Sequence, residues 1–279
     1  MSQEAFHQKW ADIRTNKKPD AVDERSLFVE PGNEPMTQRQ LNLYNYFLFI
    51  ERILREIDAK EVAEVGCGRG TMALYLAKYL DMHLTLLDNE EDAMKLAVQA
   101  FQDHGIDGDF HVGDALQTNF EDNAFDAVVS IGLAEHFPSV DDLFAEQYRI
   151  LRPGGMMISL NIPKKFSIQS LNTVHRFCKK CVGLYKDSVR KDYYRNTLRP
   201  NEFKQAAERV GFTSTEVTHV CPFTIYVPIE MRTDKLVTRM RKLILALRRP
   251  FVSYPYKTNP IIAQAHFLVG KKPGNASGA

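Results

Sequence analysis

The sequence contains few cysteines, carries almost no net charge and lacks a long apolar run. Its four cysteines are scattered through 279 residues, and without a secretory leader this usage indicates a reducing compartment. The first residues, MSQEAFHQKWADIRTNKK, contain no apolar segment of the kind found in signal peptides. The longest apolar runs fall well short of the about 20 residues that span a bilayer. We therefore expect a cytoplasmic protein.

The near-zero charge also limits the classes of partner. A net charge of +1 gives no general attraction to nucleic acid or membrane, so any such attraction must come from a local patch. With 44% hydrophobic and 25% charged residues, the composition is that of an ordinary globular chain that can bury a core. The length allows one large domain, or one domain with an appended cap.

Strand-like and helix-like patterns alternate along most of the chain. Strands are predicted at 61–65, 83–87, 109–112, 125–131, 155–161, 214–220 and 262–270. Helices are predicted at 38–57, 70–80, 90–103, 140–150 and 200–210. This alternation favours βαβ units in an α/β fold with a mostly parallel sheet.

A glycine-rich turn follows the first predicted strand. Gly66, Gly68 and Gly70 stand in a G-x-G-x-G pattern rather than the G-x-G-x-x-G of dinucleotide folds, with Thr71 at the third glycine's usual place. Glu64 before the turn suits a cationic group and is unfavourable beside a pyrophosphate. Asp88, at the end of the second strand, is correctly spaced to accept hydrogen bonds from a ribose diol. The pattern indicates a nucleoside ligand without a pyrophosphate.

Five motifs in order carry a resemblance to a known family. EVGCGRG, LLDN, GDAL, FDAVVSIGLAEHF and LRPGG resemble the motifs of class I S-adenosylmethionine-dependent methyltransferases, over roughly residues 40–160. The resemblance implies a three-layer, doubly wound, mostly parallel seven-stranded sheet with a helical cap and a C-terminal helical insertion. It also implies S-adenosyl-L-methionine as cofactor and S-adenosyl-L-homocysteine as product.

The resemblance also implies a division of the chain. The parts are an N-terminal arm and helix covering the cofactor site (1–57), a cofactor-binding core (58–162), a substrate cap (163–199), the rest of the core (200–272) with a helical insertion (221–260), and a disordered tail (273–279).

Cofactor contacts are carried over residue by residue. The resemblance places Glu64, Gly66, Cys67 and Gly68 beside the amino-acid moiety, Asp88 at the ribose, Asn89, Asp114 and Ala115 at the adenine, and Ile131 and Gly132 near the sulfonium. Simpler explanations remain for some of them. Gly68 and Gly70 could merely allow a tight turn, Asp88 could cap the next helix, and Cys67 could be a small packing residue.

Glu135 and His136 follow the fourth strand and are the candidate catalytic residues. The active sites of such sheets lie at the carboxyl ends of the parallel strands, so both side chains are expected near the transferring methyl. His136 is the candidate general base because an unperturbed imidazole has a pKa near neutral. The alternative is that His136 packs against the cofactor or caps the following helix.

The acceptor pocket is predicted from the cap and the helix before the core. Candidate acceptor contacts are Tyr44, His175, Tyr193 and Tyr194, and Met36 with Tyr44 could close the cofactor pocket. The cap's aromatic and basic residues suit an anionic or aromatic substrate, or form a solvated basic face. His175, Cys178 and Cys181 recur every three residues but lack a second pair to complete a tetrahedron, so no metal site is predicted.

Residues 231–252 form a predicted basic amphipathic helix. Leu236, Val237, Met240, Leu243, Ile244 and Leu247 fall on one face, with the cations Arg239, Arg241, Lys242, Arg248 and Arg249 largely elsewhere. Such a helix could meet an anionic membrane or a lipid-linked substrate, pack on its own domain, or form a dimer contact.

The expected activity is methyl transfer to oxygen or nitrogen of a small-molecule acceptor. A nucleic-acid or protein acceptor, a lipid-linked acceptor and a non-catalytic cofactor-binding protein are the alternatives. No nucleic-acid partner is expected, since neither an added RNA-binding module nor an extended basic groove is evident. The chain is compatible with a monomer or a homodimer.

Overall fold

A computed structural model of the chain describes residues 2–15, 27–162, 181, 194–220, 231–261, 263 and 265–274. Its centre is a seven-stranded sheet in the order β3-β2-β1-β4-β5-β7-β6. The strands are β1 (Glu61–Val65), β2 (His83–Asp88), β3 (Asp109–Val112), β4 (Phe125–Ile131), β5 (Leu151–Asn161), β6 (Thr213–Val220) and β7 (Ala265–Lys271). Strands β1 to β5 are parallel to their neighbours, and β7 runs antiparallel to β5 and β6. The predicted mostly parallel seven-stranded sheet is confirmed.

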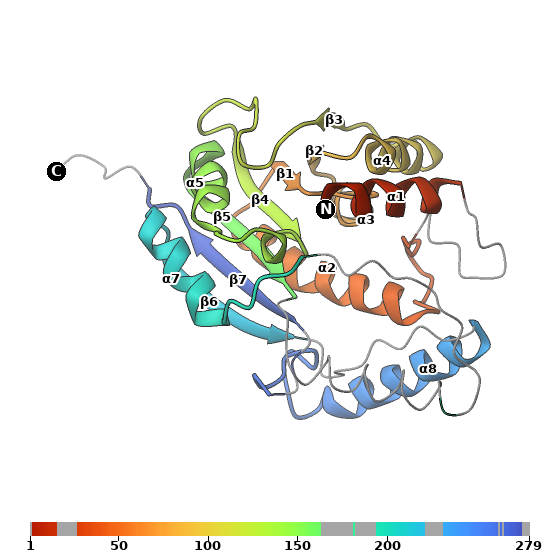
Figure 1. Cartoon of the computed structure of the whole chain (residues 1–279). Helices are drawn as coiled ribbons and strands as arrows, with labels where there is room; N and C mark the ends of the chain where they lie inside the picture. Colours follow the sequence, from red (N-terminus) through yellow and green to blue (C-terminus); the bar gives the residue numbers. More distant parts are fainter. Residues whose placement is uncertain are drawn as a thin grey trace.

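Helices cover both faces of this sheet (Figure 1). They are α1 (Ser2–Arg14), α2 (Gln38–Glu56), α3 (Thr71–Leu80), α4 (Glu91–Asp103), the 3-10 turn η1 (Ala134–His136), α5 (Asp141–Ile150), α7 (Pro200–Val210) and α8 (Met231–Arg248). Helices α2, α3 and α4 share one hydrophobic cluster with the sheet, and α5 and α7 share another. The fold therefore has the predicted three layers.

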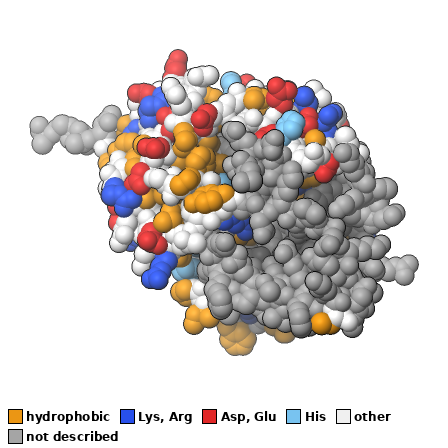
Figure 2. Space-filling view, in the orientation of Figure 1, with side chains coloured by type: hydrophobic (Ala, Val, Ile, Leu, Met, Phe, Trp, Pro, Cys, Tyr) orange, Lys and Arg blue, Asp and Glu red, His pale blue; other side chains and the backbone are white. Residues whose placement is uncertain are grey.

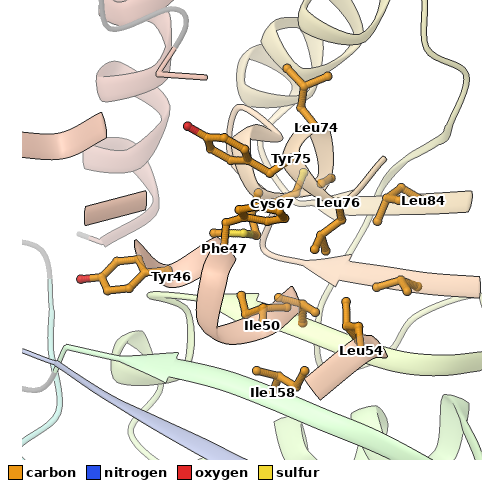
Figure 3. Packing of buried hydrophobic residues seen from close by; sticks show 14 of the residues in the cluster. Tyr46, Phe47, Ile50, Leu54, Cys67, Leu74, Tyr75, Leu76, Leu84 and Ile158 are labelled. Carbon is orange, nitrogen blue, oxygen red and sulfur yellow. The ribbon is translucent and has the colours of Figure 1, made fainter. Parts of the chain in front are cut away.

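Alternation along the strands builds these two cores. Val62 of β1 belongs to the cluster under α2 and α3, whereas its neighbour Ala63 belongs to the cluster under α5 and α7. Ile158 and Met157 of β5 divide in the same way. Successive side chains point to opposite faces, and parallel strands buried on both faces read as continuous apolar runs. Figure 3 shows the first cluster, in which α2 and α3 side chains close over the sheet.

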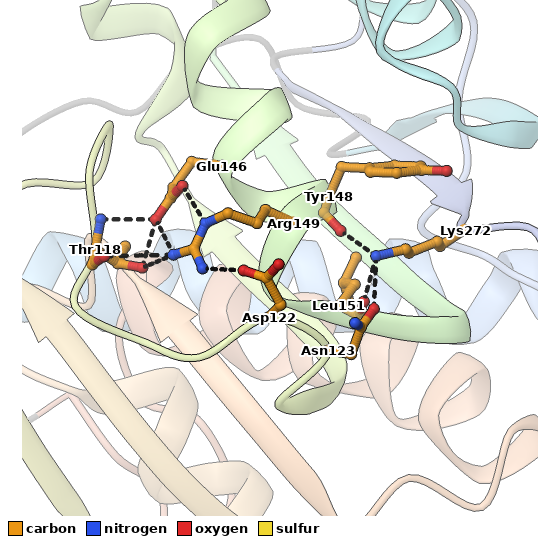
Figure 4. A network of polar contacts seen from close by, with 8 residues as sticks. All are labelled: Thr118, Asp122, Asn123, Glu146, Tyr148, Arg149, Leu151 and Lys272. Carbon is orange, nitrogen blue, oxygen red and sulfur yellow. Dashed lines mark hydrogen bonds and ion pairs between the residues drawn. The ribbon is translucent and has the colours of Figure 1, made fainter.

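A polar network fixes the loop between β3 and β4. Glu146 of α5 accepts hydrogen bonds from the backbone N–H and hydroxyl of Thr118 at 2.7 and 2.6 Å. The Arg149 guanidinium donates to Glu146 and, at 2.6 Å, to Asp122 (Figure 4). After β7, Lys272 donates to the carbonyls of Tyr148 and Leu151. These bonds hold the loop that follows Asp114 against α5.

The N-terminal residues differ from the sequence-based expectation. Residues 2–14 form helix α1, which is absent from the predicted helices, and Trp10 is buried against Ala93 and Leu96 of α4. The predicted helix over 231–252 ends earlier, at Arg248. Within the described parts of the chain, no helix is long and apolar enough to cross a bilayer, and no three His, Cys, Asp or Glu side chains gather as metal ligands.

Candidate active site

The glycine turn lies at the carboxyl end of β1 and leads into α3. Gly66, Gly68 and Gly70 have φ of 71°, 56° and 65°, a left-handed conformation that favours glycine. A Cβ on Gly66 would lie 2.7 Å from Leu133, and a Cβ on Gly68 would lie 2.9 Å from Trp10. Backbone conformation and close packing both require glycine here, so the turn presents bare backbone at the edge of the sheet.

Glu64 lies beneath this turn and is almost completely buried. Its carboxylate accepts a 2.7 Å hydrogen bond from the N–H of Ala73 in the first turn of α3, where the N-cap residue Gly70 has no side chain to do so. Burial and, to a smaller extent, the nearby Asp88 raise the pKa of Glu64 to about 8, against the effect of that hydrogen bond. A cation beside Glu64 would favour its charged form.

Asp88 ends β2 and ties that strand to the glycine turn. One carboxylate oxygen accepts from the Gly68 N–H at 2.7 Å, and the other accepts from the Glu90 N–H at 3.0 Å. Burial raises the pKa of Asp88, and these two N–H groups oppose the shift. A carboxylate has about four lone-pair positions, so both oxygens retain acceptor capacity for a diol. The N-cap alternative is not observed, since Glu90 is the N-cap of α4.

The predicted adenine-side residues border the same edge. Asn89 directly follows Asp88 and is exposed. Asp114 is exposed and accepts a 2.9 Å hydrogen bond from the Leu116 N–H, which fixes its turn. Ala115 is buried in the second hydrophobic cluster. The ends of β2 and β3 thus bring these three residues to one side of the glycine turn.

Helix α1 lies over the edge between β2 and β4. Trp10 packs on Gly68, and the Arg69 guanidinium lies 5.4 Å from the centre of its ring. Burial raises the pKa of Asp88 and the positive charge of Lys9 opposes that rise, whereas at His136 the same charge adds to the lowering by burial. Helix α1, which lies within the predicted N-terminal arm and helix (1–57), therefore packs on the glycine turn. The spacing of Phe6, Trp10 and Ile13 was a helical signal in the sequence.

The end of β4 supplies the floor of the site. Gly132 has φ of 70°, and a Cβ there would lie 3.4 Å from a Glu135 oxygen. The Glu135 side chain is 1% exposed. Burial raises its pKa to about 7, and the charge of Arg195 opposes the shift. Glu135 is therefore buried against Gly132.

His136 has a defined tautomer. Its Nδ1 lies 2.7 Å from the carbonyl oxygen of Tyr194. A carbonyl only accepts, so Nδ1 carries the proton and Nε2 carries the lone pair. Burial lowers the pKa of His136, the Tyr194 hydrogen bond raises it, and the cations Arg195 and Lys9 lower it again. The imidazole is therefore neutral at physiological pH.

Asn196 fixes the turn that carries Glu135 and His136. Its side-chain amide donates to the carbonyls of Ala134 and Phe137, both at 3.0 Å, and its backbone N–H donates to the Glu135 carbonyl at 2.7 Å. Asn196 is 4% exposed. The sequence contains no signal for this role, because the contact joins segments 60 residues apart.

The remaining predicted residues have varied locations. Cys67 is buried in the core of Figure 3, and burial raises the pKa of its thiol well above the usual value, so it packs rather than reacts. Tyr44 packs on Phe47 and Tyr75 at the contact of α2 with α3. Tyr194 meets His136 through its backbone carbonyl, not its ring. Met36 is exposed, and His175, Tyr193 and Cys178 lie outside the described residues.

The chemistry of this edge fits S-adenosylmethionine. Two buried carboxyl groups with raised pKa values, Glu64 and Asp88, suit an ammonium group and a ribose diol, respectively. The glycines of the turn permit close packing, which Leu133 uses at Gly66 and Trp10 uses at Gly68. None of these groups requires a ligand that contains a pyrophosphate, such as a dinucleotide.

Comparison with known proteins identifies the same core. Residues 63–159 match the family described as "Methyltransferase domain". The chain is 39% identical over 97 residues to a sterol 24-C-methyltransferase of Neurospora crassa, covering 34% of this chain and 26% of that protein. It is 33% identical over 157 residues to a fatty-acid O-methyltransferase of Mycolicibacterium smegmatis, covering 52% and 56%. The chain thus spans between about a quarter and just over half of these relatives.

Solved structures share the fold at low identity. The [4+2]-cyclase SpnF superposes with a TM-score of 0.58 at 17% identity, covering 98% of this chain and 95% of that one. Phosphoethanolamine N-methyltransferase 2 of Haemonchus contortus gives 0.52 at 17% identity, covering 84% and 57%. These likenesses establish the fold alone, and the cyclase illustrates that one fold serves several reactions.

Proposed function

Because this chain contains the domain of the class I S-adenosylmethionine-dependent methyltransferases, we propose that it transfers a methyl group to an oxygen or nitrogen of a small-molecule acceptor. His136 is the general base of this proposal. The observation that carries it is the Nδ1–H tautomer that the Tyr194 carbonyl imposes at the end of β4. A neutral imidazole with its lone pair on Nε2 can take a proton from an acceptor hydroxyl or amine.

The cofactor would be held along the edge already described. Asp88 would accept hydrogen bonds from the ribose hydroxyls, Glu64 would face the amino group, and Asn89 with Asp114 would border the adenine. When bound, S-adenosylmethionine supplies a methyl group on a sulfonium, which is already activated for displacement. The protein then has to align the acceptor, exclude water and remove a proton.

The roles of Glu135 and His136 differ in this proposal. His136 is half-buried, so its Nε2 is the group that removes the acceptor proton and later returns it to water. Glu135 is buried beneath Gly132 and positions the turn instead of meeting the acceptor. Asn196 holds the turn that carries both residues in place through its three hydrogen bonds.

The relatives support an apolar acceptor. Their names specify a sterol, a fatty acid and, for a Mycobacterium tuberculosis protein 34% identical over 132 residues, phthiotriol and phenolphthiotriol dimycocerosates. The last match covers 46% of each chain. A lipid acceptor is therefore the most favoured class within the proposal, ahead of nucleic acid or protein.

The acceptor class can be found by label transfer. The protein is incubated with methyl-labelled S-adenosylmethionine and a cell extract, which is then separated into lipid, small-molecule, nucleic-acid and protein fractions. We expect enzyme-dependent label in the lipid or small-molecule fraction. Label confined to nucleic acid or protein would contradict the proposed acceptor class, and cofactor binding without any transfer would favour the non-catalytic alternative.

His136→Ala then tests the base. We expect kcat to fall by about 10²–10⁴-fold, with cofactor affinity unchanged, and the acid limb of the wild-type pH profile to disappear. His83→Ala is the control, because His83 lies at the opposite end of β2, paired with Glu61. Equal turnover in both variants would assign His136 to packing.

A further inference from the structure

Helix α8 is attached to the protein by a polar face. Its buried residues recur at helical spacing and are Asp234, Thr238, Arg241 and Leu245. Asp234 accepts hydrogen bonds from the backbone N–H and side-chain amide of Gln38, at 3.3 and 2.7 Å. Leu245 packs with Leu41 and Tyr256. Three of the four inward residues are polar, which reverses the usual arrangement of a surface helix.

The apolar stripe of α8 faces away from the protein. We define the stripe as Leu236, Met240, Leu243, Ile244 and Leu247, with Phe251 just beyond the helix. Leu243 is 61% exposed, Leu247 63% and Phe251 86%. At 3.6 residues per turn, the stripe lies opposite the buried face. Figure 2 shows apolar side chains along the lower edge of the molecule, where Figure 1 places α8. Helix α8 has the predicted apolar face, and this face is exposed to solvent.

Cations border this stripe. Residues 231–258 contain eight lysines and arginines and one acid, Asp234, which is buried, although the whole chain carries only +1. Lys235, Arg239 and Arg249 are exposed. A contiguous, exposed apolar surface marks an interaction site. Long cationic side chains beside such a surface can place their charges at the level of lipid head groups. The surface is thus apolar at its centre and positive at its flank.

We propose that α8 docks the protein on an anionic lipid bilayer, lying in the plane of the interface with the stripe buried among acyl chains. The charge complementarity favours this occupant. A second copy of the chain would bring two strongly positive surfaces together, which repel. This docking goes beyond the proposed methyl transfer and does not depend on it.

Vesicle binding tests the docking with the full chain. The protein is sedimented with vesicles of phosphatidylcholine alone, or with about one third phosphatidylglycerol. We expect binding to the anionic vesicles at least roughly tenfold stronger, and weaker at high salt because ions screen the flank. Equal, salt-insensitive binding to both vesicles, or no binding to the anionic ones, would overturn the proposal.

Variants separate the stripe from its flank. The double variant Leu243→Ser with Leu247→Ser should lose on the order of tenfold or more in vesicle affinity, since two exposed leucines no longer enter the acyl region. Arg239→Gln with Arg249→Gln should remove most of the preference for anionic lipid. Val112→Ser is the control, because Val112 is 54% exposed outside α8. Circular dichroism checks that each variant is folded.

Oligomeric state supplies the independent check. Light scattering of the wild-type protein and of the leucine double variant should give the same monomeric mass in the absence of vesicles. A wild-type dimer that dissociates in the double variant would show that a second copy covers the stripe, which contradicts bilayer docking. Unchanged vesicle binding by the double variant would contradict it as well.

Discussion

The edge at the glycine turn and the surface of α8 depart from the apolar-inside rule in opposite ways. At the glycine turn, the carboxyl groups of Glu64 and Asp88 are buried, and burial raises the pKa of both. At α8, leucines and a methionine are exposed, while the buried acid Asp234 accepts two hydrogen bonds from Gln38. At the glycine turn, the hydrogen bonds of the buried carboxyl groups do not fully offset the cost of burying their charge. At α8, apolar side chains are exposed to water.

Each departure indicates the chemistry of a missing partner. A buried carboxyl whose charged form is disfavoured gains from a cationic or hydroxyl-bearing ligand. An exposed apolar stripe gains from any surface that removes it from water. The burial of Asp234 needs no ligand because its hydrogen-bond partner belongs to the chain. The burial of a polar residue therefore does not by itself indicate a ligand site. Whether the chain supplies enough hydrogen-bond partners for that residue is more informative.

Asp88→Ala should have the largest effect. It removes the acceptor of the Gly68 N–H and, in the proposed cofactor site, the acceptor for the ribose hydroxyls, so cofactor affinity should fall on the order of 100-fold. Trp10 is the only tryptophan and packs on Gly68, so its fluorescence reports binding. The matched control is Asp126→Ala, which removes a carboxylate that accepts from the Lys60 and Glu61 N–H groups, both at 2.9 Å, at the other end of β1. Equal losses in both variants would mean that the effect is structural.

Asp234→Ala should destabilise the fold by about 1–3 kcal/mol, because the amide groups of Gln38 lose a charged acceptor. Leu243→Ser, on the outward side of the same helix, should change the free energy of unfolding by less than about 0.5 kcal/mol. Urea unfolding measures both. A larger loss of unfolding free energy in Leu243→Ser would show that the apolar stripe stabilises the isolated protein. The contrast between the two sides of α8 would then be wrong.

Glu64→Gln should have the smallest effect at pH 5, and its effect grows as the pH rises. The folded pKa of Glu64 is about 8, raised from 4.5, so its contribution to stability is fully present below pH 4.5 and is lost as the pH rises through 8. Wild type should therefore lose stability relative to the variant between about pH 5 and pH 8, by about 1.4 kcal/mol per pH unit. Parallel stability curves, from urea unfolding at both ends of this range, would place the Glu64 pKa near its ordinary value.

Local patterns predicted the sheet and the glycine turn well. The signals for β1, the turn and Asp88 lie within 28 residues, where backbone geometry depends on neighbouring residues. The strand periodicity and the G-x-G-x-G spacing were therefore sufficient to locate β1, the glycine turn and the end of β2. The same holds for β4, since continuous apolar runs are typical of strands buried on both faces.

The features that the sequence did not predict depend on contacts between residues far apart in the chain. The partner of Asp234 is Gln38, which is 196 residues away, so periodicity identified the apolar face of α8 but not its outward direction. The same applies to Asn196, which holds Ala134 and Phe137 from a different segment. Helix α1 was not predicted, and the contact of Trp10 with Gly68 depends on how α1 packs on α4.

The connection that carries α8 leaves and rejoins the sheet at one point. Val220, the last residue of β6, pairs with Lys257, and the Thr258 N–H donates to the His219 carbonyl at 2.9 Å. Helix α8 therefore lies on a segment that leaves β6 and returns beside the same end of that strand. A change on the outward side of α8 can consequently alter the proposed docking surface without disturbing the pairing of β6 with β7.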